Sequence, residues 1–119
     1  MSDDSKGRRA AVLLALLAGL AASLSAVADS NIDKGRELAF DRSKGNCLAC
    51  HMIAGGESPG NIGPPLVAMK ARFPDRAKLK EQIFDATVRN PETSMPPFGH
   101  NRILTADEIE QVVDFIWSL

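Results

Sequence analysis

The 119-residue sequence has no tyrosine, one tryptophan, and only two cysteines and two histidines. It lacks the alternation of apolar and polar residues that predicts β-strands, and it has no internal repeat or low-complexity tract. Its length corresponds to one domain, which excludes a multidomain enzyme or a long repeat array. With 14 basic and 15 acidic side chains, it has no excess of either charge. Nothing in its composition therefore indicates a nucleic-acid partner.

Hydrophobic residues are concentrated at the start of the chain. After a short basic segment, residues 10–22 form an uncharged run rich in alanine and leucine, and the small-residue pattern Ala-Val-Ala follows at 26–28. This order is typical of a secretory signal peptide and its cleavage site. We therefore predict that residues 1–28 are a cleaved signal peptide and that residues 29–119 are a periplasmic domain with no stable membrane insertion.

A retained membrane anchor is the alternative for the leader. Residues 10–28 are 19 uncharged positions, close to the roughly 20 that span a bilayer.

Removal of the leader leaves 91 residues, with 11 basic and 13 acidic side chains. A domain this small usually needs a disulfide, a metal or a cofactor for its stability. The two cysteines are the first place to look for one.

Helical spacing and capping residues predict three helices. The first covers residues 31–41, and the second covers 75–89, with Asp75 as its N-cap. The third begins at Thr105, which forms a capping box with Glu108. Its apolar stripe consists of Ile109, Val112, Val113, Ile116 and Trp117. The prediction is an all-α domain with long loops at about 50–66 and 90–104, which need something to pack on.

The two cysteines lie in the segment Cys47-Leu48-Ala49-Cys50-His51, which is the attachment signature of c-type haem. Each thiol can add to one haem vinyl group, and two intervening residues let both sulfurs reach neighbouring vinyls from one turn. His51 follows directly, where its imidazole can be the proximal ligand of the iron. The sequence therefore predicts a covalently bound haem c.

The two cysteines allow three other interpretations. A thioredoxin-type redox pair needs a βαβ context that this sequence lacks. A zinc site could use Cys47, Cys50, His51 and His100, although adjacent Cys50 and His51 are poorly placed for one tetrahedral ion. A structural disulfide would close a strained four-residue ring that stabilises little by loop entropy.

The second axial ligand has four candidates: Met52, Met69, Met95 and His100. Met52 is adjacent to His51 and cannot reach the opposite haem face, and Met69 suits the ordinary core role of methionine. Met95 lies in a proline-stiffened loop between two predicted helices, which favours it as the ligand. A thioether would raise the reduction potential and leave no open position on the iron, so we predict electron transfer.

A basic stretch runs through Lys70, Arg72, Arg76, Lys78 and Lys80. Such stretches are commonly solvated faces, and docking to an acidic partner is the alternative. The loop at 61–66 also has two interpretations. It is either a simple turn, or its proline carbonyl accepts the Nδ1–H of His51.

These motifs occur in the order found in class I cytochromes c, which the sequence resembles over residues 29–119. The carriers of the resemblance are Cys47-x-x-Cys50-His51, Gly63-Pro64-x-Leu66, Met95-Pro96 and an aromatic C-terminal helix. It implies a small all-α fold around one covalent haem, with His51 and Met95 on the iron. It further implies that Pro64 accepts from His51, that Leu66 packs on the haem, and that Gly35 and Phe40 pack on the last helix.

A narrower resemblance, to the SoxX family of sulfur-oxidising bacteria, rests on the segments 45–51, 60–66, 90–99 and 103–105. It implies a monohaem subunit that pairs with the cytochrome SoxA in a heterodimer. That complex joins thiosulfate oxidatively to a cysteine of the SoxYZ carrier. The catalytic haem would be on SoxA, and this chain would pass electrons to a small downstream acceptor without being catalytic itself. The alternative is a free-standing periplasmic electron carrier of another respiratory pathway.

Overall fold

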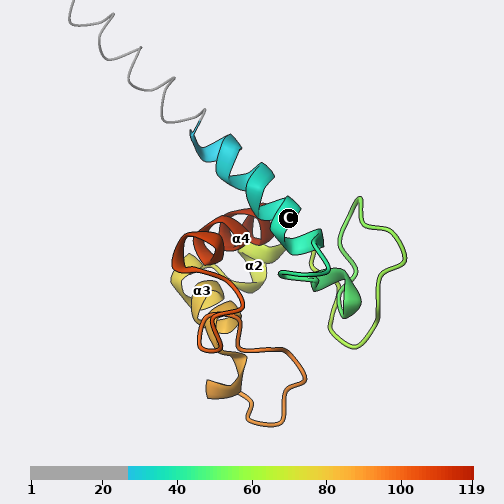
Figure 1. The fold of residues 1–119 in the computed structure, drawn as a ribbon, viewed down its shortest axis with the longest axis vertical. Helices are drawn as coiled ribbons and strands as arrows, with labels where there is room; N and C mark the ends of the chain where they lie inside the picture. The colour runs from blue at the N-terminus through green and yellow to red at the C-terminus, as the bar shows by residue number, and fades with distance from the viewer. Residues whose placement is uncertain (1–26) are drawn as a thin grey trace, which may run out of the picture. The chain divides into compact units, whose positions relative to one another are not determined.

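The computed structural model describes residues 27–119, in which residues 31–119 form one unit (Figure 1). Residues 27–40 are helical. The later elements are the 3-10 turn η1 (Cys47–Ala49), the helices α2 (Met69–Arg72) and α3 (Arg76–Phe84), the 3-10 turn η2 (Ala86–Val88) and the helix α4 (Ala106–Ser118). This described part of the chain contains no strand, and the predicted all-α class is confirmed.

The predicted signal peptide, residues 1–28, falls almost entirely outside the described residues. Its cleavage after residue 28 therefore stays a prediction. Among the helices of residues 27–119, none has the length and apolar character needed to cross a membrane.

The first helix packs against α4 at very close range within residues 31–119. A Cβ atom on Gly35 would lie 1.9 Å from the carbonyl oxygen of Gln111 and 2.9 Å from Cβ of Phe115. The rings of Phe40 and Phe115 meet edge to face, with centroids 5.9 Å apart. Gly35 thus sets the separation of the two helices, as the resemblance to class I cytochromes c implied.

The start of α4 has the predicted capping box. Thr105 Oγ1 accepts a hydrogen bond from Glu108 N at 3.3 Å, and Glu108 Oε2 accepts one from Thr105 N at 2.8 Å. Two of the four free N–H groups at this helix end are satisfied in this way. The apolar stripe is buried and forms the centre of the core, with the side chains of Ile109, Val112, Val113 and Ile116 at most 3% exposed.

Replacement of Thr105 by alanine is expected to lower the free energy of unfolding by about 1 kcal/mol, because the cap is lost while the core is untouched. Thr105→Ser keeps a hydroxyl at the same position and should stay close to wild type. Urea unfolding of the two variants, followed by circular dichroism, measures the difference. Equal stability of the alanine and serine variants would contradict a contribution from the cap.

The second predicted helix is wrong in its extent, because residues 75–89 do not form one helix. α3 ends at Phe84, and Asp85 is extended, with φ −155° and ψ 92°. The Asp85 carboxylate accepts from Thr87 N at 3.0 Å and so caps η2. Gly99 N, from the second long loop, donates to the Phe84 carbonyl at 3.0 Å. Local capping and a distant loop therefore supply the partners that a continuous helix would have used.

The short helix α2 was not predicted, and it is held by the end of the chain. Met69 N donates to the carbonyl of Leu119 at 3.1 Å. Trp117 Nε1 donates to the carbonyl of Phe73, the residue after α2, at 3.0 Å. These contacts join residues far apart in the sequence. The four residues of α2 alone therefore do not indicate a helix.

Candidate functional site

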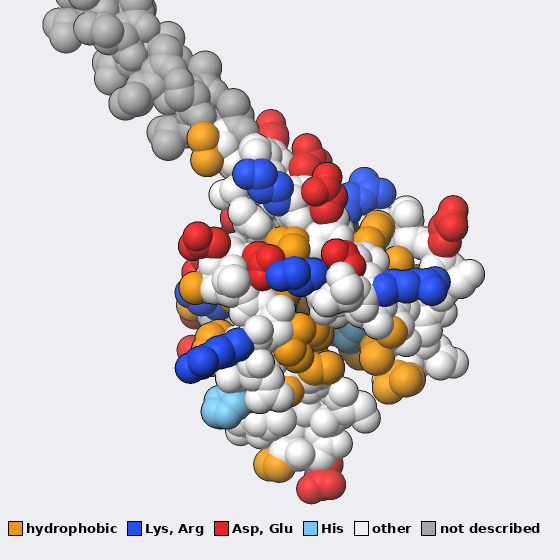
Figure 2. Space-filling view, viewed as in Figure 1, with side chains coloured by type: hydrophobic (Ala, Val, Ile, Leu, Met, Phe, Trp, Pro, Cys, Tyr) orange, Lys and Arg blue, Asp and Glu red, His pale blue; other side chains and the backbone are white. Residues whose placement is uncertain are grey.

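A cavity of about 670 Å³ is lined by both long loops, α3 and α4. Figure 2 shows hydrophobic side chains gathered around a hollow in the face drawn. No polar side chain among residues 27–119 is fully buried, and the volume is typical of sites for small molecules and cofactors. Every site residue predicted from the sequence lines this one cavity: Cys47, Cys50, His51, Pro64, Leu66 and Met95.

The turn η1 brings the attachment segment together. Asn46 enters it with a left-handed backbone, φ 48°. The carbonyl of Cys47 then accepts from Cys50 N at 3.2 Å and from His51 N at 2.9 Å. The two half-buried thiols and the imidazole are therefore presented from a single turn, as attachment to neighbouring positions of one ring system requires.

Burial raises the pKa of the Cys47 thiol to about 11. A thioredoxin-type redox pair belongs to a βαβ context, and residues 27–119 contain no strand. Within residues 27–119, no three His, Cys, Asp or Glu side chains are grouped to hold a metal ion. Neither the thioredoxin-type nor the zinc interpretation has support in this geometry.

His51 is oriented by the loop that follows it. Its Nδ1 lies 2.7 Å from the carbonyl oxygen of Pro64. Because a carbonyl can only accept, Nδ1 carries the proton and donates it, which leaves the lone pair of Nε2 free. An imidazole fixed in this tautomer is suited to bind a metal through Nε2.

Gly63 has a role that the sequence alone did not assign. A Cβ atom at this position would lie 2.3 Å from Cε1 of His51, so only glycine lets the imidazole occupy its place. Gly63 N also donates to the carbonyl of Cys50 at 2.8 Å, which ties the loop to the attachment turn. The one sequence feature that could have indicated this role is the position of Gly63 directly before Pro64, whose carbonyl accepts from His51.

Two of the four candidates for the second axial ligand do not line the cavity. Met52 is 51% exposed, and the imidazole of His100 is 69% exposed, 3.7 Å from Asp85. Met69 and Met95 both line the cavity. Met69 is 2% exposed at the start of α2, where Arg72 Nη1 lies 3.4 Å from its sulfur.

The backbone of Met95 is held within its loop, and its thioether faces α3. Met95 N donates to Oγ1 of Thr93 at 3.1 Å. The sulfur of Met95 lies 4.0 Å from Nε2 of Gln82 in α3. Gln82 also lines the cavity, and no sequence motif pointed to it.

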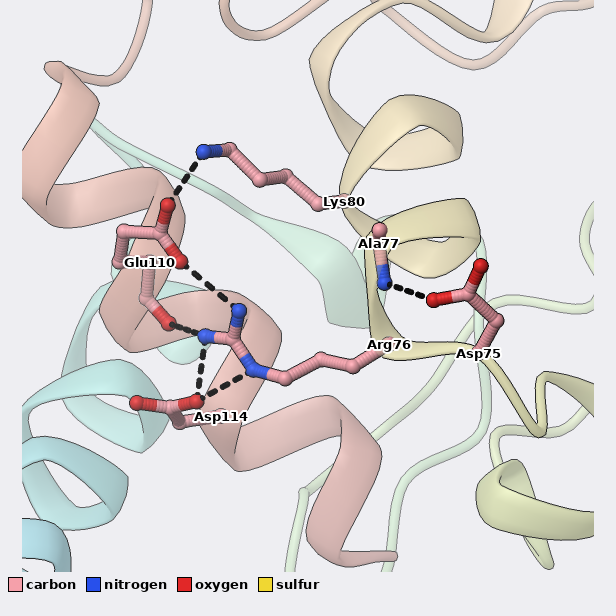
Figure 3. Close-up of polar contacts among 6 residues, drawn as sticks. All are labelled: Asp75, Arg76, Ala77, Lys80, Glu110 and Asp114. Atoms are coloured by element: carbon pink, nitrogen blue, oxygen red, sulfur yellow. Dashed lines mark hydrogen bonds and ion pairs between the residues drawn. The ribbon is translucent and has the colours of Figure 1, made fainter.

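The basic stretch pairs within the chain (Figure 3). Arg76 contacts Asp114 at 2.5 Å and the carboxylate of Glu110 at 2.9 Å, and Lys80 pairs with the same Glu110. The bond from Lys80, and then that from Arg76, lowers the pKa of Glu110. The other three cations lie as follows: Lys70 over the Trp117 ring, Arg72 on the Pro65 carbonyl, and Lys78 on Glu81. Arg76 and Lys80 thus join α3 to α4, and the internal contacts of all five cations weaken the interpretation of the stretch as a free docking surface.

Comparison with known proteins places this geometry in a family. Residues 30–116 match the family model described as cytochrome C oxidase, cbb3-type, subunit III. An uncharacterized lipoprotein of Aquifex aeolicus (strain VF5) is 35% identical over 78 residues, 61% of this chain. The chain spans 36% of the length of that relative. The crystal structure of SoxXA from P. pantotrophus contains a similar chain, with a TM-score of 0.65 and 29% identity, covering 72% of this chain and 79% of that one.

The residues present fit the haem c that this likeness implies. The cavity is mostly apolar and large, two thiols project from one turn, and an imidazole with a free Nε2 lies beside them. Gly63 leaves room for the imidazole where a side chain would fill it. The predicted class I cytochrome c fold and the predicted likeness to SoxX are confirmed. The chain belongs to the family described as cytochrome c oxidase, cbb3-type, subunit III, and it is an electron-transfer cytochrome c.

Proposed function

We propose that this chain is the SoxX-type subunit of a thiosulfate-oxidising complex and accepts the electrons released when thiosulfate is joined to a carrier cysteine. The observation that carries the proposal is the similarity to a chain of SoxXA over 79% of that chain's length. The segments on which the resemblance to SoxX rests, 45–51, 60–66 and 90–99, contain the site residues of the cavity. The proposed partner is a SoxA-type cytochrome, and the SoxYZ carrier is reached through the complex.

The residues of the cavity would each have a distinct role toward one haem c. Cys47 and Cys50 would form the two thioether bonds, and His51 and Met95 would be the axial ligands. When bound, the haem supplies an iron that gains and loses one electron. Pro64 holds the imidazole in the tautomer that directs Nε2 into the cavity, and Leu66 contributes apolar contact.

The same residues account for a role in electron transfer without chemistry on a substrate. With Met95 and His51 as ligands, the chain itself would supply both of the protein ligands of the iron. Both cysteines are committed to attachment, and the sequence has no third cysteine to act as a nucleophile. We therefore propose that catalysis belongs to the partner and that this subunit receives and passes on single electrons.

Coexpression with a SoxA-type cytochrome, in a host that matures c-type haem, tests the proposal. We expect the two chains to co-elute and the haem of this chain to be reduced when thiosulfate and SoxYZ are added. Omission of SoxYZ is the matched control and should abolish the reduction. A monomeric cytochrome that does not co-elute with SoxA and is not reduced in the presence of thiosulfate and SoxYZ would overturn the assignment.

The family match favours a second candidate, an electron carrier of another respiratory pathway. The matched model describes a subunit of a cbb3-type oxidase. Rapid reduction or oxidation of the purified protein by a respiratory complex, without any SoxA, would support this alternative. Both candidates need the same cavity, so only the partner distinguishes them.

We expect Met95→Leu to abolish the long-wavelength absorption band of a methionine–iron bond while the haem stays attached. Leucine keeps the apolar volume but has no sulfur, so the ligand is lost with little change in packing. Met69→Leu is the control, because it changes the other thioether of the cavity in the same way. If the band survives in Met95→Leu and disappears in Met69→Leu, the ligand is Met69.

A further inference from the structure

The loop at 60–66 is tied to the attachment segment by backbone hydrogen bonds on either side of two prolines. Three of its N–H groups donate to carbonyls of the segment 48–52, over 2.7, 2.8 and 2.9 Å, and they belong to Gly60, Gly63 and Leu66. Pro64 and Pro65 lie between the last two donors and have no N–H to contribute. The part of the loop whose carbonyl orients His51 therefore cannot hold itself in place by backbone donation.

Arg72 supplies a contact to the proline pair from outside the loop. Its Nη1 donates to the carbonyl of Pro65 at 2.8 Å and lies 3.4 Å from the sulfur of Met69. Among the ion pairs within residues 27–119, none involves Arg72. The donors of this guanidinium are therefore used for a carbonyl one residue away from the carbonyl that accepts from His51.

The helix that carries Arg72 is itself fixed to the end of the chain. α2 lies beside α4 (Figure 1), and Met69 N donates to the carbonyl of Leu119 at 3.1 Å. Trp117 Nε1 donates to the carbonyl of Phe73, directly after Arg72, at 3.0 Å. Arg72 thus joins a helix held by α4 to a loop segment that has no donors of its own.

We propose that Arg72 is a positioning residue that fixes the Pro64–Pro65 segment and so keeps the Pro64 carbonyl on Nδ1 of His51. This inference rests on the proposed function only in taking His51 as an axial ligand. The bond from Nδ1 to Pro64 O, at 2.7 Å, sets the tautomer and the ring orientation of the imidazole. Without the contact from Arg72, the segment moves more freely and this bond is broken for a larger fraction of the time.

Arg72→Met in the haem-loaded, reduced protein tests the inference, because methionine keeps an apolar stem and removes both the donor and the charge. We expect the Nδ1 proton of His51, followed by NMR, to exchange with water about fivefold faster. This factor corresponds to the loss of one hydrogen bond of ordinary net strength. The methionine–iron band should be unchanged, because neither contact of Arg72 involves Met95.

Two references separate this local effect from a general loss of stability or of charge. The backbone N–H of Val113, a fully buried residue of α4, should exchange at the wild-type rate, because it reports opening of the core. Lys70→Met removes the other cation of α2, whose Nζ lies 5.0 Å from the centroid of the Trp117 ring. This control variant should leave the exchange of the His51 proton unchanged.

The possible outcomes separate this inference from the proposed function. An Arg72→Met variant whose His51 proton exchanges at the wild-type rate overturns the inference, and so does equal acceleration at His51 and Val113. Arg72→Gln is the second variant should the methionine variant fold poorly, because its amide ends two atoms short of the guanidinium nitrogens. It should reproduce the faster exchange. A protein that does not pair with SoxA contradicts the proposed function and leaves this inference intact, whereas a haem without His51 as its ligand contradicts both.

Discussion

A chain in which Cys47 and Cys50 are both replaced by serine is expected to carry no covalent haem and to lose most of its helical structure. Both thioether positions are removed, so nothing holds the group through purification. The cavity of about 670 Å³ would then lack the group that fills it. The apolar wall of the cavity would then face water, a loss comparable with the whole stability of a small domain.

Haem staining of the denatured protein and far-ultraviolet circular dichroism measure the two effects. The single variants Cys47→Ser and Cys50→Ser are informative controls, because each keeps one thioether and the His51 ligand. They should retain some haem and more helix than the double variant. A double variant that remains fully helical without haem would show that the cavity needs no cofactor for folding, contrary to this account.

Replacement of Gly35 by alanine is expected to lower the free energy of unfolding by about 3 kcal/mol, the upper part of the range for overpacking. The new Cβ would lie 1.9 Å from the carbonyl oxygen of Gln111, which is a backbone atom that cannot rotate away. Helix propensity acts in the opposite direction, because alanine is favoured over glycine by up to about 1 kcal/mol in a helix. A lower free energy of unfolding would therefore show that the close contact between the helices dominates, and a higher one would show that helix propensity dominates.

Guanidinium unfolding of the haem-loaded protein provides the measurement for Gly35→Ala. Lys34→Ala, at an exposed neighbouring position of the same helix, is the control and should stay within about 0.5 kcal/mol of wild type. A Gly35→Ala variant that is more stable than wild type would mean that the first helix and α4 do not meet at Gly35.

Local chemistry made much of the fold predictable. The capping box of Thr105 and the stripe that follows it involve contacts within one helix, so their residues identify them without tertiary information. The attachment segment was equally clear, because two thiols and an imidazole at fixed spacing have few other uses. The predicted site residues that line the cavity all belong to short motifs, and each motif indicates the chemistry of its residues.

The remaining features depend on contacts between distant segments. α3 ends at Phe84 because Gly99 and Asp85 supply alternative hydrogen bonds, which the continuous helical pattern of 75–89 does not reveal. The role of Gly63 depends on its distance from the His51 ring, and the contact of Gln82 depends on a loop that follows it in the chain. The basic stretch was ambiguous for the same reason, since its acidic partners lie on α4.

The mass of the mature protein, measured after denaturation with and without a thiol-alkylating reagent, tests the central claim most directly. The account predicts the mass of the polypeptide plus one haem, with no change on alkylation, because Cys47 and Cys50 are both in thioether bonds. A haem-free polypeptide that gains two alkyl groups would contradict it.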